Sequence, residues 1–493
     1  MIYRSLIETC ETYTRQGLTQ LAVRKLKDLA PGKIPREWQL PVANLCRRNG
    51  LVAEGLRILT PPYAMDREAW LGMVKPAEVA EYALLLQRIG SVNEALRILE
   101  RVSETEFVDV LLYRAYCHFN RWEYKEALPL LRKYLSYPLG EYKNLVGRVN
   151  LAAALVALAR TGEARDLLEE LDAQCRAQKH FRLVANCQEM MAQLALSNFD
   201  LERAKFHVRS SSEVLHQSST LDELFVRKVQ AVAEALEKNS PAPLEHFRRE
   251  ALARHDWESA RDMDFFRLKQ WFDQDRFHYL IFGTPFPAYR ERVIKQFGLR
   301  PEIEYYQLGD AKGPVLNVFT GEVGVPQPLT PGGKVHQLLD ILTRDFYRPV
   351  PLGTLFYELF PGESFDIFSS TNRVHQILRR TRRWLRENNL PVRIRNQNGN
   401  YQLTIHGPFA IQVPYERKSV CWFALLLQRL KSRLSADRLY AAHVLRQELG
   451  LGPASFRRFA AWALELGHIE RIGSGPATAY RTCFTADELD RTG

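Results

Sequence analysis

A short block of residues recurs along the first half of the chain, and it limits the fold more than any other feature. Each block has a small residue followed by apolar residues at helical spacing. The small residues lie 33, 40, 32, 37, 40 and 56 positions apart, at Ala22, Gly55, Ala95, Ala127, Ala164, Ala204 and Ala260. The first five spacings suit a unit of two helices, and the last leaves room for an extra element.

Such units stack because each helical hairpin leaves an apolar face that only its neighbour covers. The first four blocks resemble tetratricopeptide (TPR) repeats, whose second helix opens with similar residues, here Gly90, Glu94, Ala95, Tyr124, Glu126 and Ala127. The resemblance implies an α-solenoid with a concave groove for a protein, peptide or small-ligand effector. An irregular helical domain with chance similarity is the alternative. Aromatic residues could line the groove, but inter-helix core is the more common role of Tyr113, Tyr116, Phe119 and Trp122.

Composition narrows the class of protein further. With 493 residues the chain is long enough for two to four domains, and its net charge of +11 favours an anionic partner. Seven cysteines without a CxxC pair make a disulfide scaffold or zinc site improbable. The apolar stretches are too short to span a membrane. Glu8 and Glu11 lie where a signal peptide needs its apolar core, so a signal peptide is not expected. We therefore expect a cytoplasmic protein without a membrane partner.

The helical pattern changes near Phe282. Three short strands are expected, over residues 302–309, 314–320 and 322–326. A helix from near Pro331, a second in residues 350–360 and a third from about Ser369 to Asn389 follow them. A hairpin follows with Asn398-Gly399 as its turn. The third helix has a buried stripe made of Val374, Ile377, Leu378, Thr381 and Leu385, and most of its other residues are polar or basic.

This order of elements resembles the winged-helix domain of OmpR/PhoB-type response regulators and of the related SARP-type activators. The residues from Val374 to Leu385 align without gaps on the family's recognition helix, although Thr381 replaces a Leu and Trp384 a Lys. Gly399, Tyr401 and Leu403 match the family's wing. The resemblance implies a third helix that enters the DNA major groove. The family's receiver domain has no counterpart in residues 1–280, so control by phosphorylation is doubtful.

The residue types support DNA binding independently, because Arg, Asn and Gln read base edges or clamp phosphates. Residues 331–405 contain eleven basic and six acidic residues. A solvated basic face is the alternative explanation. Base contacts are expected mainly from Asn372, Arg373, Gln376 and Arg380, with DNA contact also expected from His375. Phosphate contacts are expected from Arg379, Arg383, Arg393 and Arg395.

Residues 406–493 predict a second, smaller winged helix. After a helical segment over residues 416–434, helices over residues 437–451 and 454–467 are separated by a break at residues 450–453, and a hairpin follows. Phe456, Phe459, Ala460 and Ala463 form the inward stripe, while DNA contacts are expected from Ser455, Arg457 and Arg458. Winged helices also bind proteins or dimerise, so this unit has two open roles.

No catalytic or metal-binding motif is apparent. The sequence has no HExxH, no Walker-type phosphate loop and no GxSxG elbow, and Asp262 and Asp264 read as solvated helix residues. We therefore expect neither an enzyme nor a cofactor.

These observations predict a mostly α protein, with a TPR-like α-solenoid over residues 1–282 followed by two α+β winged-helix domains over residues 283–405 and 406–493. The predicted function is a DNA-binding transcriptional regulator, in which the array senses an effector and the winged helices bind double-stranded DNA. The alternative is a scaffold whose winged helices mediate protein contacts or homodimerisation.

Overall fold

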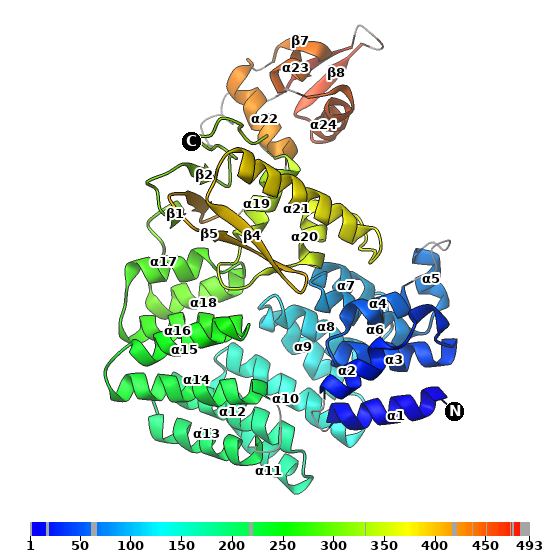
Figure 1. Cartoon of the computed structure of the whole chain (residues 1–493), viewed down its shortest axis with the longest axis vertical. Coiled ribbons are helices and arrows are strands. Elements are labelled where there is room, and N and C mark those ends of the chain that lie inside the picture. The colour runs from blue at the N-terminus through cyan, green and yellow to red at the C-terminus, as the bar shows by residue number, and fades with distance from the viewer. Residues whose placement is uncertain are drawn as a thin grey trace. The chain divides into compact units, whose positions relative to one another are not determined.

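A computed structural model of the chain describes residues 2–15, 19–60, 67–215, 220–330, 332–416, 422–435, 437–449, 451–473, 475 and 478–483. The described part is mostly helical, which confirms the predicted class (Figure 1). None of its helices is long and apolar enough to cross a bilayer.

Residues 2–297 form successive helices joined mostly by short turns, and we call them the repeat array (Figure 1). The helices of its first half are α1 (Ile2–Arg15), α2 (Thr19–Lys27), α3 (Arg36–Arg48), α4 (Val52–Leu59), α5 (Arg67–Met73), α6 (Pro76–Arg88), α7 (Val92–Leu99), α8 (Asp109–Phe119) and α9 (Tyr124–Leu135). Those of its second half are α10 (Glu141–Ala157), α11 (Thr161–Ala177), α12 (Phe181–Ser197), α13 (Leu201–Leu215), α14 (Thr220–Glu237), α15 (Ala242–Ala253), α16 (Trp257–Gln270), α17 (Gln274–Phe282) and α18 (Pro287–Phe297).

The small residues that define the repeat lie where helices approach one another. All seven are buried, and each sits in the second helix of a pair. At Gly55 a Cβ atom would lie only 2.7 Å from Cδ2 of Leu85 in α6. The extra length before Ala260 is occupied by α14 and α15. The predicted array of helical hairpins is therefore confirmed.

The turns inside the array share one backbone conformation. The residue after a helix has a positive φ at Gly50, Gly90, Trp122, Ala159, Lys179, Phe199, Asn239 and His255. The next N–H bonds to the carbonyl five residues back, as from Leu51 to Cys46 at 2.8 Å and from Glu123 to His118 at 2.9 Å. This hydrogen bond defines a Schellman cap, which ends one helix before the next begins. Most sequence blocks therefore begin at a capping turn.

One of these turns gives a stability prediction. Lys179 is exposed and has a φ of +59°, a conformation that costs roughly 1 kcal/mol for a residue with a Cβ atom. Lys179→Gly should raise the free energy of unfolding by about 1 kcal/mol, measured by chemical denaturation. Lys179→Ala keeps the Cβ atom and should leave this free energy nearly unchanged. Equal effects of the two substitutions would contradict the capping explanation.

The described residues after α18 form further helices and three small sheets. In the first, β6 (Ala410–Pro414) lies between β1 (Tyr305–Gly309) and β2 (Val315–Asn317), antiparallel to β1 and parallel to β2. The second has the order β3-β5-β4, formed by β3 (Val350–Pro351), β5 (Asn400–Ile405) and β4 (Val392–Gln397). Asn398 and Gly399 both have positive φ, which confirms the predicted hairpin turn.

The second and third sheets belong to segments with the same order of elements. Along the chain α19 (Lys334–Leu342), β3, α20 (Leu352–Leu359), α21 (Ser370–Glu387), β4 and β5 follow one another. Near the C-terminus the order is α22 (Trp422–Arg433), β7 (Leu439–Ala441), α23 (Ala442–Leu449), α24 (Pro453–Glu465), β8 (Ile469–Ile472) and β9 (Ala479–Thr482). The third sheet has the order β7-β9-β8, so in both segments the last strand lies in the middle.

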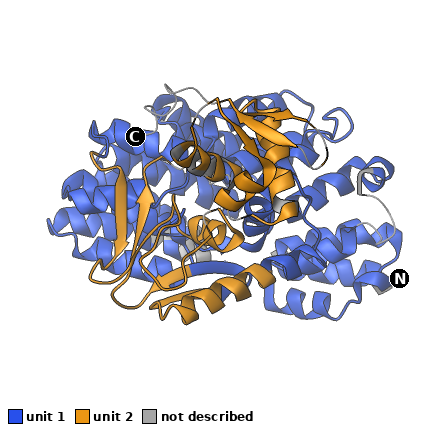
Figure 2. Ribbon diagram, turned by 90° about the horizontal axis from the view of Figure 1, so that it is seen from above, with its two compact units in different colours: residues 1–301, 344–374, 396–402 blue, residues 302–343, 375–395, 403–493 orange. Residues whose placement is uncertain are grey.

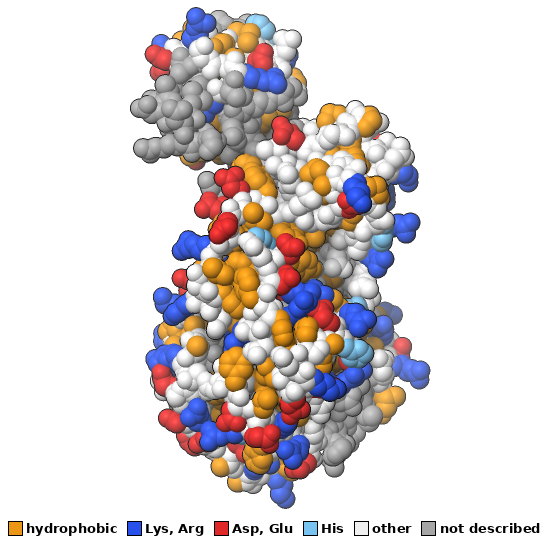
Figure 3. All heavy atoms as spheres, turned by 90° about the vertical axis from the view of Figure 1, so that its left-hand side faces the viewer, with side chains coloured by type: hydrophobic (Ala, Val, Ile, Leu, Met, Phe, Trp, Pro, Cys, Tyr) orange, Lys and Arg blue, Asp and Glu red, His pale blue; other side chains and the backbone are white. Residues whose placement is uncertain are grey.

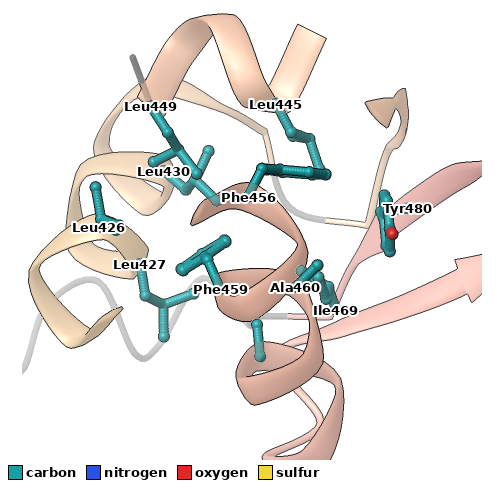
Figure 4. Close-up of a cluster of buried hydrophobic side chains, with 11 residues drawn as sticks. Leu426, Leu427, Leu430, Leu445, Leu449, Phe456, Phe459, Ala460, Ile469 and Tyr480 are labelled. Carbon is teal, nitrogen blue, oxygen red and sulfur yellow. The ribbon is translucent and has the colours of Figure 1, made fainter. Parts of the chain in front are cut away.

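The last segment has its own hydrophobic core. Phe456 and Phe459 of α24 pack with leucines of α22 and α23, and Tyr480 of β9 completes the cluster (Figure 4). Ala460 and Ala463 are also buried, so the predicted inward stripe is confirmed. The predicted stripe of α21 is likewise buried from Val374 to Leu385.

Three local expectations are corrected. The helix expected from Pro331 begins at Lys334 behind an extended Gly333, and Pro331 itself lies outside the described residues. Residues 439–441 were expected to be helical but form β7, because they pair with β9. Within residues 322–326, only Val323 makes a bridge, to Leu316, so the expected third strand is absent from this described segment.

The chain divides into two compact units that interleave along the sequence (Figure 2). The first comprises residues 1–301, 344–374 and 396–402, and the second comprises residues 302–343, 375–395 and 403–493. The first unit therefore contains the repeat array together with a distant segment, residues 344–374, which we call the strap. The domain boundaries at residues 282 and 405 stay predictions.

A buried histidine in the second unit predicts a pH dependence. The imidazole of His336 accepts a hydrogen bond at Nδ1 from the Gly332 N–H at 2.7 Å, and its Nε2 donates to the Val318 carbonyl at 2.8 Å. Only the neutral ring can do both. Burial lowers the pKa of His336 below that of a free histidine. The unfolded chain therefore binds the proton first, and stability falls as the pH drops below about 6.5.

We expect this loss to reach up to about 1.4 kcal/mol at pH 5.5. Comparing His336→Gln with the unsubstituted protein, by denaturation at pH 7.5 and 5.5, isolates the effect. A glutamine side chain can accept and donate without titrating, so the variant should lose less stability on acidification. An identical loss in both proteins would show that His336 is not responsible.

Candidate ligand cavity and nucleic-acid interface

The repeat array and the strap line an open cavity of about 560 Å³. One wall comes from α10, α12, α14 and α16, which contact one another in that order. The other walls include Phe119 and Trp122 from the α8–α9 turn, Arg292 of α18 and Arg348 of the strap. Phe119 and Trp122 thus line this cavity, whereas Tyr113 and Tyr116 are not among its lining residues. The volume is within the usual range for small-molecule sites.

The acidic groups of the wall already have partners. Lys228 of α14 forms a buried ion pair with Asp262 of α16. Glu258 accepts hydrogen bonds from Arg261 at 2.8 and 2.9 Å and from the Trp122 indole N–H at 3.3 Å. Burial opposes the charged form of Lys228, but Asp262 outweighs it, and the pKa of Lys228 is raised.

Two arginines of the wall, unlike its acidic groups, lie over aromatic rings. Within the described residues, neither Arg292 nor Arg348 has an ion-pair partner. The guanidinium of Arg292 instead lies over the rings of Trp122 and Phe265, 5.9 and 5.1 Å from their centroids. Arg348 lies over Trp257 at 5.8 Å, and its buried Nε has no hydrogen-bond partner in the described part of the chain. The wall thus carries two guanidinium groups that lie over aromatic faces and have no ion pair within the described residues.

The strap is anchored to the last helices of the array by buried charges. Arg261 of α16 has no exposed surface and donates to both carboxylate oxygens of Asp345 at 2.9 Å. The hydroxyl of Tyr347 donates to Asp264 at 2.7 Å, and Asp264 also pairs with Arg248 and Arg276. Burial lowers the pKa of Arg261, but Asp345 and Glu258 outweigh that effect and raise it overall.

The strap is anchored a second time, at the turn between α6 and α7. The Gly353 N–H donates to the Ile89 carbonyl and the Thr354 hydroxyl to the Gly90 carbonyl, both at 2.9 Å. The Phe365 N–H donates to the buried carboxylate of Glu94 at 3.0 Å. A Cβ atom at Gly90 would lie 2.6 Å from Cβ of Pro351. The strap therefore connects two distant parts of the repeat array.

The predicted DNA-contacting residues of α21 and its hairpin are mostly exposed. This holds for Asn372, His375, Gln376, Arg379, Arg380, Arg383, Arg393 and Arg395. Within the described residues, Arg379, Arg380 and Arg383 have no ion-pair partner. Arg373 differs, because it pairs with Glu363 and its guanidinium lies 3.9 Å from the centre of the Phe360 ring. Its role as a base contact stays a prediction, and its charge is already partly engaged.

The departures of α21 from the OmpR/PhoB pattern have a structural explanation. The indole N–H of Trp384 donates to the Gln327 carbonyl at 2.8 Å, so the side chain is inward and buried. The Thr381 hydroxyl is buried and donates to the Ile377 carbonyl at 3.0 Å. Neither substitution removes a charge from the exposed face that Arg379, Arg380 and Arg383 form.

The predicted contacts of the C-terminal segment are only partly described. Arg457 and Arg458 follow Phe456 on α24 and are exposed. The side chain of Ser455 lies outside the described residues. Among the described residues, no group of three or more His, Cys, Asp or Glu side chains is placed to hold a metal ion.

Neither the strap nor the arginines of the cavity could be recognised from the sequence. The strap was read only as helices of a winged helix, and its partners Arg261 and Asp264 lie about eighty positions earlier. The expectation that Asp262 and Asp264 are solvated is wrong, since Asp264 is buried and Asp262 pairs with Lys228. The signal available in the sequence was an acidic residue beside aromatic residues, in Asp345-Phe346-Tyr347.

No protein-family model matches the chain, and no curated protein matches its sequence. Among solved structures, MamA MSR-1 C2 is 19% identical with a TM-score of 0.28, covering 37% of this chain and 96% of that one. The apo form of RapI is 11% identical with a TM-score of 0.35, covering 57% and 86%. A tetratricopeptide repeat protein from Parabacteroides merdae ATCC 43184 is 15% identical with a TM-score of 0.32, covering 60% and 99%. These TM-scores are low.

Proposed function

We propose that the chain is a cytoplasmic, non-enzymatic transcriptional regulator that binds double-stranded DNA and responds to an effector bound by its repeat array. The observation that carries the proposal is the element order α-β-α-α-β-β, which occurs twice with the last strand central. A winged helix has this order, and its third helix enters the major groove. In the two segments the third helices are α21 and α24.

The charge distribution supports the same proposal. Residues 331–493 hold 23 basic and 14 acidic residues, which is most of the chain's excess positive charge. On α21 the exposed arginines lie opposite the buried stripe, and Arg393 and Arg395 are exposed on the hairpin that would form the wing. Guanidinium groups on these two elements fit phosphates and guanine edges. On the face drawn in Figure 3, by contrast, acidic and basic side chains intermingle over the repeat array.

A second candidate function is a protein-interaction scaffold. It is favoured by the repeat array itself, which makes up most of the first unit and lines a cavity with polar and aromatic walls. In this case the basic face of α21 would meet an acidic protein surface, or the second winged helix would form a homodimer. The two candidates differ in what the basic face binds.

Selection from random-sequence DNA by the full-length protein tests the proposal. A regulator should enrich one sequence, and its affinity for that sequence should fall with salt at a log–log slope of about −0.9 per phosphate contacted. Fluorescence anisotropy on the enriched duplex and on an unrelated duplex supplies both quantities. If no sequence is enriched, the regulator proposal fails and the scaffold becomes the better explanation.

A further inference from the structure

We infer that the cavity of the repeat array is a binding site for a small anionic ligand, a carboxylate or phosphate on an apolar body, held between Arg292 of the array and Arg348 of the strap. The inference deepens the proposed function, because it names the chemical class of the effector and the place where it binds. It rests on the proposal that the array senses a ligand.

The charge of the ligand follows from the pairing inside the wall. Lys228 pairs with Asp262, and Glu258 binds Arg261, which also pairs with Asp345. Glu189 accepts a hydrogen bond from Gln193 at 3.4 Å. Arg292 and Arg348 line the same cavity and have no ion pair within the described residues. An oxyanion is the complement of two guanidinium groups, because it accepts several of their fixed donors at once.

A neighbouring lysine is repelled by Arg292. The side chain of Lys269 on α16 lies 4.5 Å from the centre of the Phe199 ring. Its pKa is lowered, chiefly by burial and also by repulsion from Arg292. An anion beside Arg292 would relieve this repulsion as well.

The apolar body of the ligand follows from the rest of the wall. The rings of Trp122, Phe265 and Phe286 line the cavity, together with Val149, Met190 and Leu196. Arg292 already stacks on two of these rings, so a flat group could continue the stack. A free inorganic ion would leave these surfaces uncovered, and we expect it to bind more weakly than an aromatic anion.

The position of Arg348 gives the site a regulatory consequence. This residue lies three positions after Asp345, whose carboxylate is held by Arg261. Arg261 in turn binds Glu258, which belongs to the cavity wall. A ligand that bridges Arg292 and Arg348 would therefore tie the strap more firmly to the array.

Titration of the full-length protein with defined probes tests the inference. The probes are phenyl phosphate, benzoate and inorganic phosphate, with benzamide as a neutral analogue. Binding is followed by tryptophan fluorescence and by the thermal midpoint, which a ligand of the folded state raises. Phenyl phosphate and benzoate should bind, inorganic phosphate more weakly, and benzamide not measurably at about 10 mM.

Three variants locate the site. Arg292→Gln and Arg348→Gln should each weaken phenyl phosphate binding about ten- to hundredfold, the usual effect of losing a charged hydrogen-bond partner. Arg203→Gln removes an exposed arginine of α13 and should leave the affinity unchanged. Absence of binding by both aromatic anions, or an affinity in both cavity variants equal to that of the unsubstituted protein, would overturn the inference. DNA selection is independent of this titration, so the two proposals can fail separately.

Discussion

Replacing Asp345 by alanine is expected to lower the free energy of unfolding of the first unit by about 3–5 kcal/mol. The substitution removes the carboxylate that binds Arg261 through two hydrogen bonds of 2.9 Å. The guanidinium of Arg261 has no exposed surface, so water cannot replace the lost partner. Breaking a buried ion pair on one side leaves an uncompensated charge, which is more costly than losing an exposed pair.

The rest of the network adds to the expected loss. Asp345 also accepts the backbone N–H groups of Tyr347 and Arg348, at 2.9 and 3.0 Å. These bonds shape the turn from which Tyr347 reaches Asp264. Glu258 would remain the only carboxylate bound to Arg261, and its own side chain is about half exposed. We therefore expect the strap to separate from α16 and α17 before the array unfolds.

Two further variants distinguish the loss of the buried Asp345–Arg261 pair from the loss of any charged side chain in the strap. Asp345→Asn keeps an acceptor for the backbone N–H groups and should cost less than Asp345→Ala. Glu358→Ala breaks the partly exposed pair with Arg344 in the same strap, and should cost no more than about 1 kcal/mol. Chemical denaturation gives the energies, and hydrogen exchange of residues 344–374 reports strap release. Equal losses in Asp345→Ala and Glu358→Ala would refute the role assigned to the buried pair.

Local patterns in the sequence were sufficient for the repeat array. A small residue at a fixed place in each block, followed by leucines at helical spacing, reports how closely two neighbouring helices approach. All the contacts concerned lie within one repeat or between adjacent repeats. For this reason Ala95 and Ala127 could be assigned to helix interfaces, and both are buried.

Contacts between distant segments could not be predicted in this way. Asp264 was expected to be solvated because acidic residues on helices usually are, and its partner Tyr347 lies 83 positions later. The strand β6 was missed for a similar reason, since its partners β1 and β2 lie about a hundred positions earlier. A periodic pattern identifies a buried face, but it does not identify the element that covers that face.

Some properties of the basic residues of α21 could be predicted from the sequence, and others could not. The buried stripe and the exposed arginines were predicted because helical periodicity determines them. The hairpin turn was predicted from the local Asn398-Gly399 signal. The engagement of Arg373 by Glu363 depends on how the preceding loop folds, and no spacing rule predicts it. The choice of DNA as the partner of this face stays a proposal, which substitution of the exposed arginines can test.

The triple variant Arg379→Gln, Arg380→Gln, Arg383→Gln is expected to lower affinity for the selected DNA sequence at least about a hundredfold. One bidentate base contact is worth about 1–3 kcal/mol, and each lost phosphate contact flattens the salt slope by about 0.9. Because the three side chains are exposed and lie outside the buried stripe, the fold should be retained. The thermal midpoint of the triple variant should therefore match that of the unsubstituted protein.

A variant with the same change of charge elsewhere distinguishes recognition from general electrostatic attraction. Arg57, Arg203 and Arg249 are exposed on the repeat array, and replacing all three by glutamine also removes three positive charges. If α21 reads the DNA, this control should keep the sequence preference and lose only a few-fold in affinity. If both triple variants lose affinity equally, α21 is not a recognition helix. A scaffold would show a third result, in which neither variant changes DNA binding but the α21 variant loses an acidic protein partner.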